Sequence, residues 1–123
     1  MTTPPDAPAL AALHGRSVLL TQDASPRDLE ALLALATRLE ALDRAGRSTA
    51  LLPDQLAYAL FFDNSTRTKS AWAGAAARLG MQPVIVDGSS TQVAHGETAE
   101  DTGAMLGRNA HALGVRHDLI LGE

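Results

Sequence analysis

The segment 57-AYALFF-62 is an unbroken apolar run that stops at Asp63 and Asn64. A short apolar run between polar residues is typical of a strand that is buried on both faces of a parallel sheet. The runs 83-PVIVD-87 and 118-DLILG-122 predict a second and a third strand. With helical segments between them, these strands predict an α/β fold: an open parallel sheet with helices on both faces, joined by right-handed crossovers.

Three segments predict helices. Between residues 25 and 47, leucine and alanine recur at three- and four-residue spacing, which indicates an amphipathic helix with Ser25 as its N-cap. A second helix is expected from about residue 66 to residue 79, because Gly80 follows as a stop signal. A third is expected from about residue 99 to residue 112, with Thr98 as its cap.

Length and composition indicate one domain. A chain of 123 residues with 46% apolar positions is long enough for one hydrophobic core and too short for two domains of ordinary size. Residues 1–14, which contain three prolines, are expected to form a flexible N-terminal arm, and residues 15–123 are expected to form the domain. The absence of cysteine excludes a disulfide framework and a thiolate metal site.

The charge pattern narrows the choice of partners. The net charge of −4 arises from 14 acidic and 10 basic side chains without a basic run, which disfavours nucleic acid and anionic membranes as partners. No apolar run reaches the roughly 20 residues needed to span a bilayer. The first residues also lack the basic segment of a secretory signal. A cytoplasmic protein is therefore expected.

The segment 65-STRT-68 lies where the first predicted strand ends and the next helix begins, which is the ligand-binding end of an open parallel sheet. Free backbone N–H groups and the helix dipole favour an anion there. The hydroxyls of Ser65, Thr66 and Thr68 add short donors, and Arg67 adds a planar guanidinium suited to phosphate. The alternative is that the hydroxyls only cap the helix and the arginine is solvated. The GxxxxGK[ST] pattern of a P-loop is absent.

Residues 61–80 resemble the carbamoyl-phosphate motif of the aspartate and ornithine transcarbamylases, F-x-x-x-S-T-R-T followed by R-x-S-F-E-x-A-x-x-x-L-G. The segment 91-TQVAHGETAEDTGAMLGR-108 is similar to an ornithine-type loop, and 114-GVRHD-118 is similar to the site of a second arginine. The resemblance covers about residues 15–122. FFDNSTRT, QVAHGET, GVRHD and an alanine in place of glutamate at position 73 are closest to the knotted, substrate-unassigned group, with ornithine-type enzymes as the nearest alternative.

The resemblance implies an activity and a set of site residues. Family members transfer the carbamoyl group of carbamoyl phosphate to an amine without a metal or an organic cofactor. The residues that would bind carbamoyl phosphate are Ser65, Thr66, Arg67, Thr68 and Arg116. Arg67 would stabilise the leaving phosphate and Arg116 would reach the carbonyl oxygen, so both are the expected catalytic residues. Gln92 would enter the site of a neighbouring subunit in a homotrimer, and His95 is a further candidate from the same loop.

The remaining polar residues have simpler interpretations. Glu97 and Asp101 match acidic family positions, but capping and packing of the following helix explain them as well. His14, His111 and His117 lack metal-ligand spacing and are expected at the surface. Trp72 is expected to anchor its helix in the core.

Two family features are missing from the sequence. Neither the H-P-x-Q motif nor the second domain, which binds the amine acceptor, is present. The chain is therefore expected to be the N-terminal domain of a carbamoyltransferase, as a fragment, a truncated gene product or part of a split protein, and to be inactive alone. The alternatives are a non-catalytic phosphate-binding module and a trimer-forming structural piece. An uncovered strand edge at residues 118–122 predicts self-association of the isolated chain.

Overall fold

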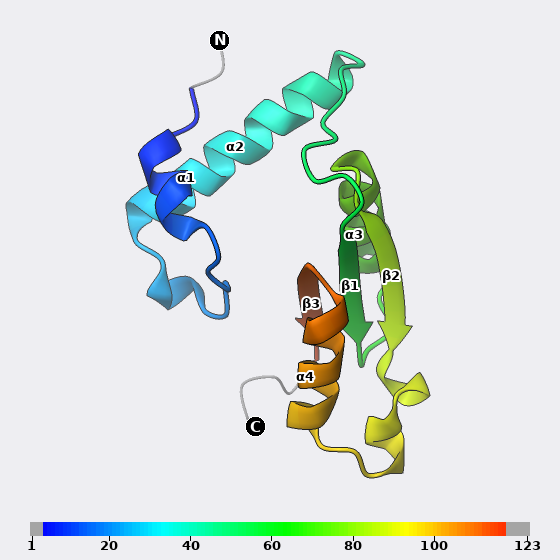
Figure 1. Cartoon of the computed structure of the whole chain (residues 1–123). Helices are drawn as coiled ribbons and strands as arrows, with labels where there is room; N and C mark the ends of the chain where they lie inside the picture. The colour runs from blue at the N-terminus through cyan, green and yellow to red at the C-terminus, as the bar shows by residue number, and fades with distance from the viewer. Residues whose placement is uncertain (1–3, 118–123) are drawn as a thin grey trace. The chain divides into compact units, whose positions relative to one another are not determined.

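The computed structural model describes residues 4–117. The chain divides into two compact units, residues 1–49 and residues 50–123, and each unit has its own helical or sheet scaffold (Figure 1).

The first unit is helical. It contains α1 (Ala7–Leu13), a short 3-10 turn (Thr21–Asp23) and α2 (Pro26–Arg44). The two α-helices pack together through small side chains, of which Ala9 and Ala31 are buried. The amphipathic helix expected from residue 25 is thus present, and a capping box between Ser25 and Asp28 begins it.

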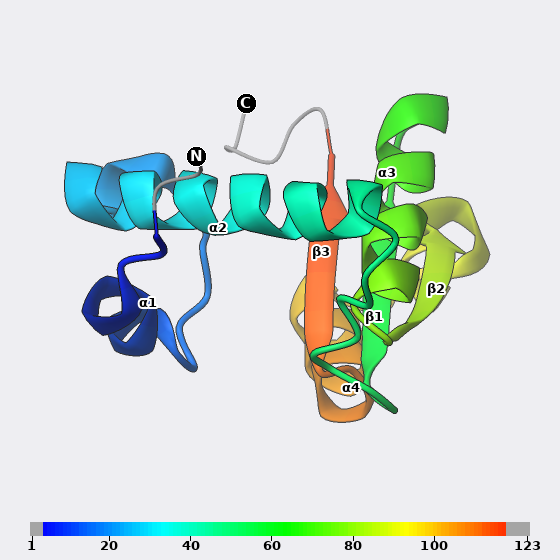
Figure 2. The ribbon, with the colours of Figure 1, turned by 90° about the horizontal axis from the view of Figure 1, so that it is seen from above.

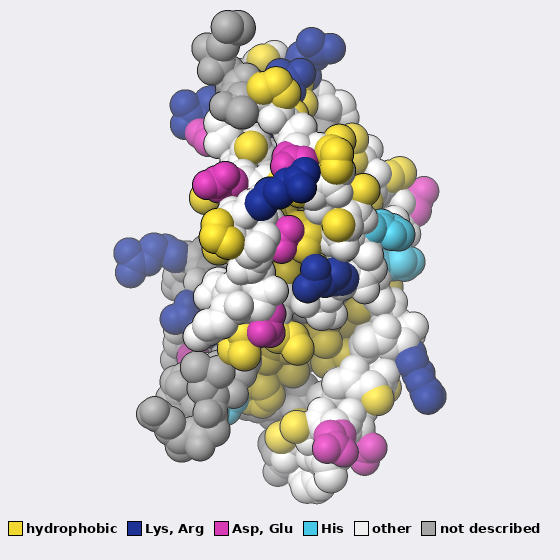
Figure 3. Space-filling view, turned by 90° about the vertical axis from the view of Figure 1, so that its left-hand side faces the viewer, with side chains coloured by type: hydrophobic (Ala, Val, Ile, Leu, Met, Phe, Trp, Pro, Cys, Tyr) yellow, Lys and Arg dark blue, Asp and Glu magenta, His cyan; other side chains and the backbone are white. Residues whose placement is uncertain are grey.

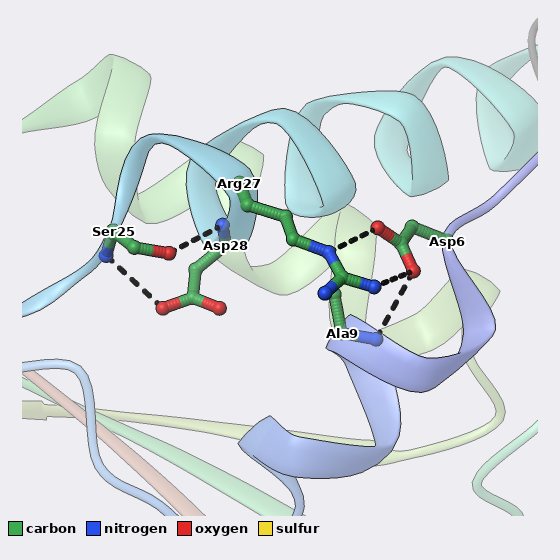
Figure 4. Close-up of polar contacts among 5 residues, drawn as sticks. All are labelled: Asp6, Ala9, Ser25, Arg27 and Asp28. Carbon is green, nitrogen blue, oxygen red and sulfur yellow. Dashed lines mark hydrogen bonds and ion pairs between the residues drawn. The ribbon is translucent and has the colours of Figure 1, made fainter.

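Helix α1 differs from the expectation of a flexible arm over residues 1–14, because residues 7–13 are helical. Asp6 caps this helix by accepting a hydrogen bond from the backbone N–H of Ala9 at 3.2 Å. The same carboxylate accepts hydrogen bonds from Arg27 Nε at 2.8 Å and Nη2 at 3.0 Å, as Figure 4 shows. The prolines of this segment predict irregular structure, but Pro8 lies in the first turn of α1, where a helix tolerates proline. The domain boundary at residue 15 stays a prediction.

The Asp6–Arg27 contact changes the acidity of both groups. Hydrogen bonds from Arg27 and from the Ala9 N–H lower the pKa of the Asp6 carboxyl, and desolvation opposes them only in part. The hydrogen bond to Asp6 raises the pKa of Arg27 in turn. The pair therefore favours the charged form of each partner.

The second unit is a parallel α/β layer structure. Its elements are β1 (Leu56–Phe61), α3 (Thr66–Arg78), β2 (Gln82–Asp87), two 3-10 turns (Gly88–Ser90 and Gln92–His95), α4 (Ala99–Asn109) and β3 (Ala112–Arg116). The strand order is β2-β1-β3, and both pairings are parallel. Because β2 and β3 lie on opposite sides of β1, right-handed crossovers place α3 and α4 on opposite faces. Figures 1 and 2 show this arrangement, which confirms the predicted fold class.

The core of the second unit lies between the sheet and α3. Ala57, Ala76 and Met81 are buried together. Trp72 packs against them, as expected for a core anchor, and its indole covers Gly114 of β3. The small residues of β1 and β3 leave the space that this ring occupies.

The third strand differs from the prediction. The structure places β3 at Ala112–Arg116, and α4 ends at Asn109 rather than near residue 112. Alanine and glycine favour strands weakly, so 112-ALGVR-116 lacks the β-branched signal that marks β2. The segment 118–122, which was expected to form the strand, lies outside the described residues.

Several large apolar side chains remain exposed, and Figure 3 shows such side chains among charged ones on one face. In the second unit they include Leu113 and Val115, which lie on β3. Within the described residues each of β2 and β3 has a partner on one side only. No helix of residues 4–117 is long and apolar enough to cross a membrane.

Candidate functional site

The N-terminus of α3 lies directly beyond the carboxyl end of the central strand β1. Its N-cap residue, Ser65, is extended, with φ −154° and ψ 102°, and its side chain makes no capping hydrogen bond. The caps of the other three α-helices, Asp6, Ser25 and Thr98, each accept a backbone N–H. Residue 65 is thus a cap by position only, and the first turn of α3 keeps its backbone donors free of side-chain caps.

The Ser65 hydroxyl contacts an arginine instead. Arg116 is the last residue of β3 and lies in register with Phe61, the last residue of β1. Its Nη1 donates to Ser65 Oγ at 3.0 Å and to Thr68 Oγ1 at 2.7 Å. Each hydroxyl oxygen therefore accepts a hydrogen bond from Arg116 and keeps its own O–H as a donor. The structure brings Ser65, Thr68 and Arg116 together, as a shared anion site requires.

Thr66 and Arg67 lie on the same turn and are exposed. Within residues 4–117 the Arg67 guanidinium makes no hydrogen bond or ion pair. One arginine of the predicted pair is thus held by hydroxyls, and the other is open to solvent. Uncapped N–H groups, hydroxyl groups that each keep an O–H donor, and these two cations make a surface that can bind a tetrahedral oxyanion.

The loop candidates do not reach this cluster. Gln92 and His95 lie on the 3-10 turn that follows β2, and both are exposed. Within residues 4–117 neither side chain makes a hydrogen bond or ion pair with residues 65–68 or Arg116. Glu97 accepts a hydrogen bond from the buried Thr102 hydroxyl at 3.0 Å, which agrees with a packing role. Any role of the two loop residues in a neighbouring subunit's site stays a prediction.

An ion pair that the sequence does not predict lies beside the cluster. Lys69 Nζ lies 2.8 Å from Asp87 Oδ1, at the end of β2, and 5.5 Å from the centre of the Phe61 ring. These residues and four neighbours (Phe62, Asp63, Asn64 and Ser89) line a cavity of about 170 Å³. No signal in the local sequence links Lys69 to Asp87, because the two residues are 18 positions apart.

One histidine at the surface has a structural contact that the sequence did not indicate. Within residues 4–117 no group of three or more His, Cys, Asp or Glu side chains is placed to hold a metal ion. His111, expected as a plain surface residue, is exposed, but its Nδ1 accepts the Leu56 N–H at 3.0 Å. Since Leu56 O also accepts the His111 N–H at 2.9 Å, this residue joins the amino ends of β1 and β3.

The fold and the cluster are those expected of an α/β domain that binds an anion at the carboxyl end of a parallel sheet. Residues 16–123 match the family of the aspartate/ornithine carbamoyltransferase carbamoyl-P binding domain, and the chain belongs to this family. YgeW of Escherichia coli, a carbamoyltransferase by name, is 38% identical over 110 residues, 89% of this chain and 28% of that protein. The ornithine carbamoyltransferase of Parafrankia sp. is 37% identical over 105 residues, 85% of this chain and 33% of that protein.

A solved structure gives the same result. The aspartate transcarbamoylase of Trypanosoma cruzi, in complex with carbamoyl phosphate and aspartate, matches with a TM-score of 0.80 and 32% identity, over 93% of this chain and 34% of that chain. The resemblance to an enzymatic transferase family is thereby confirmed. The chain spans about a third of the length of these relatives, between 28% and 34% in the three named. The knotted, substrate-unassigned group and the ornithine-type enzymes both stay open as finer assignments.

Proposed function

We propose that this chain supplies the carbamoyl-phosphate site of an enzyme that transfers a carbamoyl group to an amine. The observation that carries the proposal is the arrangement of Arg116, whose Nη1 is held by Ser65 Oγ and Thr68 Oγ1 at an otherwise uncapped helix N-terminus. A guanidinium already held in place loses less side-chain entropy when an anion binds than a solvated one does. The family match supplies the identity of the anion.

In this proposal the residues act on the two charges that develop during transfer. The amine nitrogen attacks the carbonyl carbon, and the carbonyl oxygen becomes an oxyanion. As the C=O bond re-forms, the C–O bond to phosphate breaks, phosphate leaves, and the amine nitrogen loses a proton to the departing phosphate or to solvent. The α3 N–H groups, the hydroxyls of residues 65, 66 and 68, and Arg67 hold the phosphate as it leaves. Arg116 lies on the β3 side of this turn and serves both the oxyanion and the phosphate. Donors fixed before reaction stabilise such charge without reorganising.

The finer assignments belong to the same proposal. The acceptor is an amino-acid-like amine, which the remaining two thirds of a complete enzyme would bind. The complete enzyme is a cytoplasmic homotrimer in which Gln92, with His95 near it, completes the site of an adjacent subunit. The exposed position of both side chains on a turn is compatible with that role.

Calorimetric titration of the chain with carbamoyl phosphate, and separately with inorganic phosphate, tests the proposal. Hydrogen bonds to charged groups contribute about 1.5–3 kcal/mol, so Arg67→Ala and Arg116→Ala are each expected to raise Kd by about tenfold or more. Arg108→Ala, which removes an exposed arginine from the last turn of α4, is the matched control.

The outcomes test the site. Equal binding by wild type, Arg67→Ala and Arg116→Ala would contradict the site. Binding that depends on both arginines is the expected result. Carbamoylated product is not expected from the chain alone, so its absence does not favour the non-catalytic phosphate-binding module over the carbamoyltransferase domain. Circular dichroism of each variant confirms that the fold is retained.

A further inference from the structure

The last rung of the sheet carries three side chains on the face that α3 covers. Asp87 of β2 and Arg116 of β3 are both in register with Phe61 of β1, so they flank it on either side. Phe61 is buried, with 4% of its surface exposed. The charged residues on either side of this ring have opposite sign.

Both flanking residues contact the first turn of α3. On the β3 side, Arg116 donates to the hydroxyls of Ser65 and Thr68. On the β2 side, Asp87 pairs with Lys69 at 2.8 Å, and the lysine ammonium lies over the Phe61 ring. The first turn of α3, which carries the proposed phosphate donors, is therefore bound by side-chain contacts to β2 on one side and to β3 on the other.

The Lys69–Asp87 ion pair affects the proposed phosphate donors because Lys69 is next to one of them in the sequence. Lys69 directly follows Thr68, so a movement of the Lys69 backbone also moves the Thr68 hydroxyl. The Lys69 side chain is 28% exposed and the Asp87 side chain is 60% exposed, so the pair is partly screened by solvent and contributes little to global stability. Its effect is local, because it fixes one end of a short turn against the end of β2.

We propose that Lys69 and Asp87 are positioning residues for the phosphate site. Their ion pair holds the first turn of α3 at the distance where Ser65 and Thr68 meet Arg116, and neither residue contacts the anion. The inference rests on the proposed function, since it concerns the affinity of that same site. It assigns the lysine charge to Asp87 and leaves the two arginines as the cations that bind phosphate.

The sign of the effect at Asp87 distinguishes this role from direct binding by Lys69. If Lys69 bound phosphate itself, Lys69→Met would weaken binding, and Asp87→Asn would strengthen it by freeing the ammonium and removing a nearby negative charge. If the pair positions the turn, both substitutions weaken binding. In the double variant the two losses of affinity are also not additive, because the first substitution already breaks the ion pair and the second removes no further interaction.

Titration with inorganic phosphate at physiological ionic strength is the experiment. Lys69→Met and Asp87→Asn are each expected to raise Kd about three- to tenfold, and the double variant by no more than the larger single effect. Lys69→Arg, which keeps the pair, and the exchange of the two residues (Lys69→Asp with Asp87→Lys) are expected to stay within about twofold of wild type. Arg27→Met, which breaks an ion pair in the other unit, is the matched control.

Each result has one meaning. Tighter binding by Asp87→Asn, additive losses in the double variant, or unchanged affinity in all variants would overturn the positioning role. If the thermal unfolding midpoints of the variants fall in proportion to their loss of phosphate affinity, the ion pair acts only on overall stability, and the positioning role is overturned as well. If wild type itself does not bind phosphate, the proposed function fails and takes this inference with it, whereas variant effects alone test only the inference.

Discussion

Replacing Gly114 by alanine tests the packing of the sheet against α3. A Cβ at this position would lie 2.6 Å from Cζ3 and 2.7 Å from Cη2 of Trp72. Carbon atoms in contact lie about 3.5–4.0 Å apart, so the overlap is about 1 Å and one side must move. Trp72 packs against the core of Ala57, Ala76 and Met81, but a cavity of about 270 Å³ beside the indole leaves room for tilting.

Overpacking a core of this kind costs about 1–3 kcal/mol, and the neighbouring cavity places the expected loss at about 1–2 kcal/mol. Urea unfolding of wild type and Gly114→Ala measures this loss as a shift in midpoint at constant slope. Gly103→Ala is the matched control, because nothing lies within 4 Å of a Cβ there and alanine favours the helix by about 1 kcal/mol. A loss at Gly114 below about 0.5 kcal/mol, or a loss at Gly103, would refute the packing argument.

Three further predictions use other contacts. Ser25→Ala is expected to lower the free energy of unfolding by about 1 kcal/mol because it removes a capping box, whereas Ser65→Ala, which removes no cap, is expected to weaken phosphate binding at nearly constant stability. Because the pKa of Asp6 is lower in the folded chain, its contribution to stability is complete above the unfolded aspartate pKa of about 3.9 and is lost as acid protonates it. When the free energy of unfolding is measured against pH, Asp6→Asn is therefore expected to reduce the fall in stability over this acid range. His111→Leu is expected to cost about 0.5–1.5 kcal/mol in urea unfolding, because an exposed strand N–H loses its acceptor, and an unchanged midpoint would contradict the contact.

The sheet could be predicted from local sequence where the strands were strongly apolar. The runs that became β1 and β2 were apolar enough to be identified, and the fold class followed from their spacing. The third strand was misplaced because the small residues of 112-ALGVR-116 give a weak strand signal. The structure shows that Gly114 makes room for the Trp72 ring, which is too far away in the sequence for a local pattern to reveal the contact. Helix α1 was missed for a similar reason, since Arg27 stabilises its cap from a distant position in the sequence.

The candidate site could be predicted only in part. Residues 65–68 were found from local chemistry, because hydroxyls and an arginine at a helix start have a recognisable pattern. Arg116 came from the family resemblance alone, since 48 and 51 residues separate it from the two hydroxyls it contacts. The pairing of Lys69 with Asp87 followed from neither source, because an ion pair between a helix and a strand end depends on register.

The strand order explains why the proposed site lies at α3 rather than at α4. The chain leaves β1 for β2 on one side and then crosses to β3 on the other, so β1 is the point at which the winding reverses. Ligands of open α/β sheets bind outside the carboxyl end of such a strand, since the adjacent connections diverge there. At this point β2 contributes a carboxylate that already has a lysine partner, whereas β3 contributes a guanidinium that, within residues 4–117, contacts only hydroxyls. An anion is therefore expected to bind on the β3 side of the α3 N-terminus.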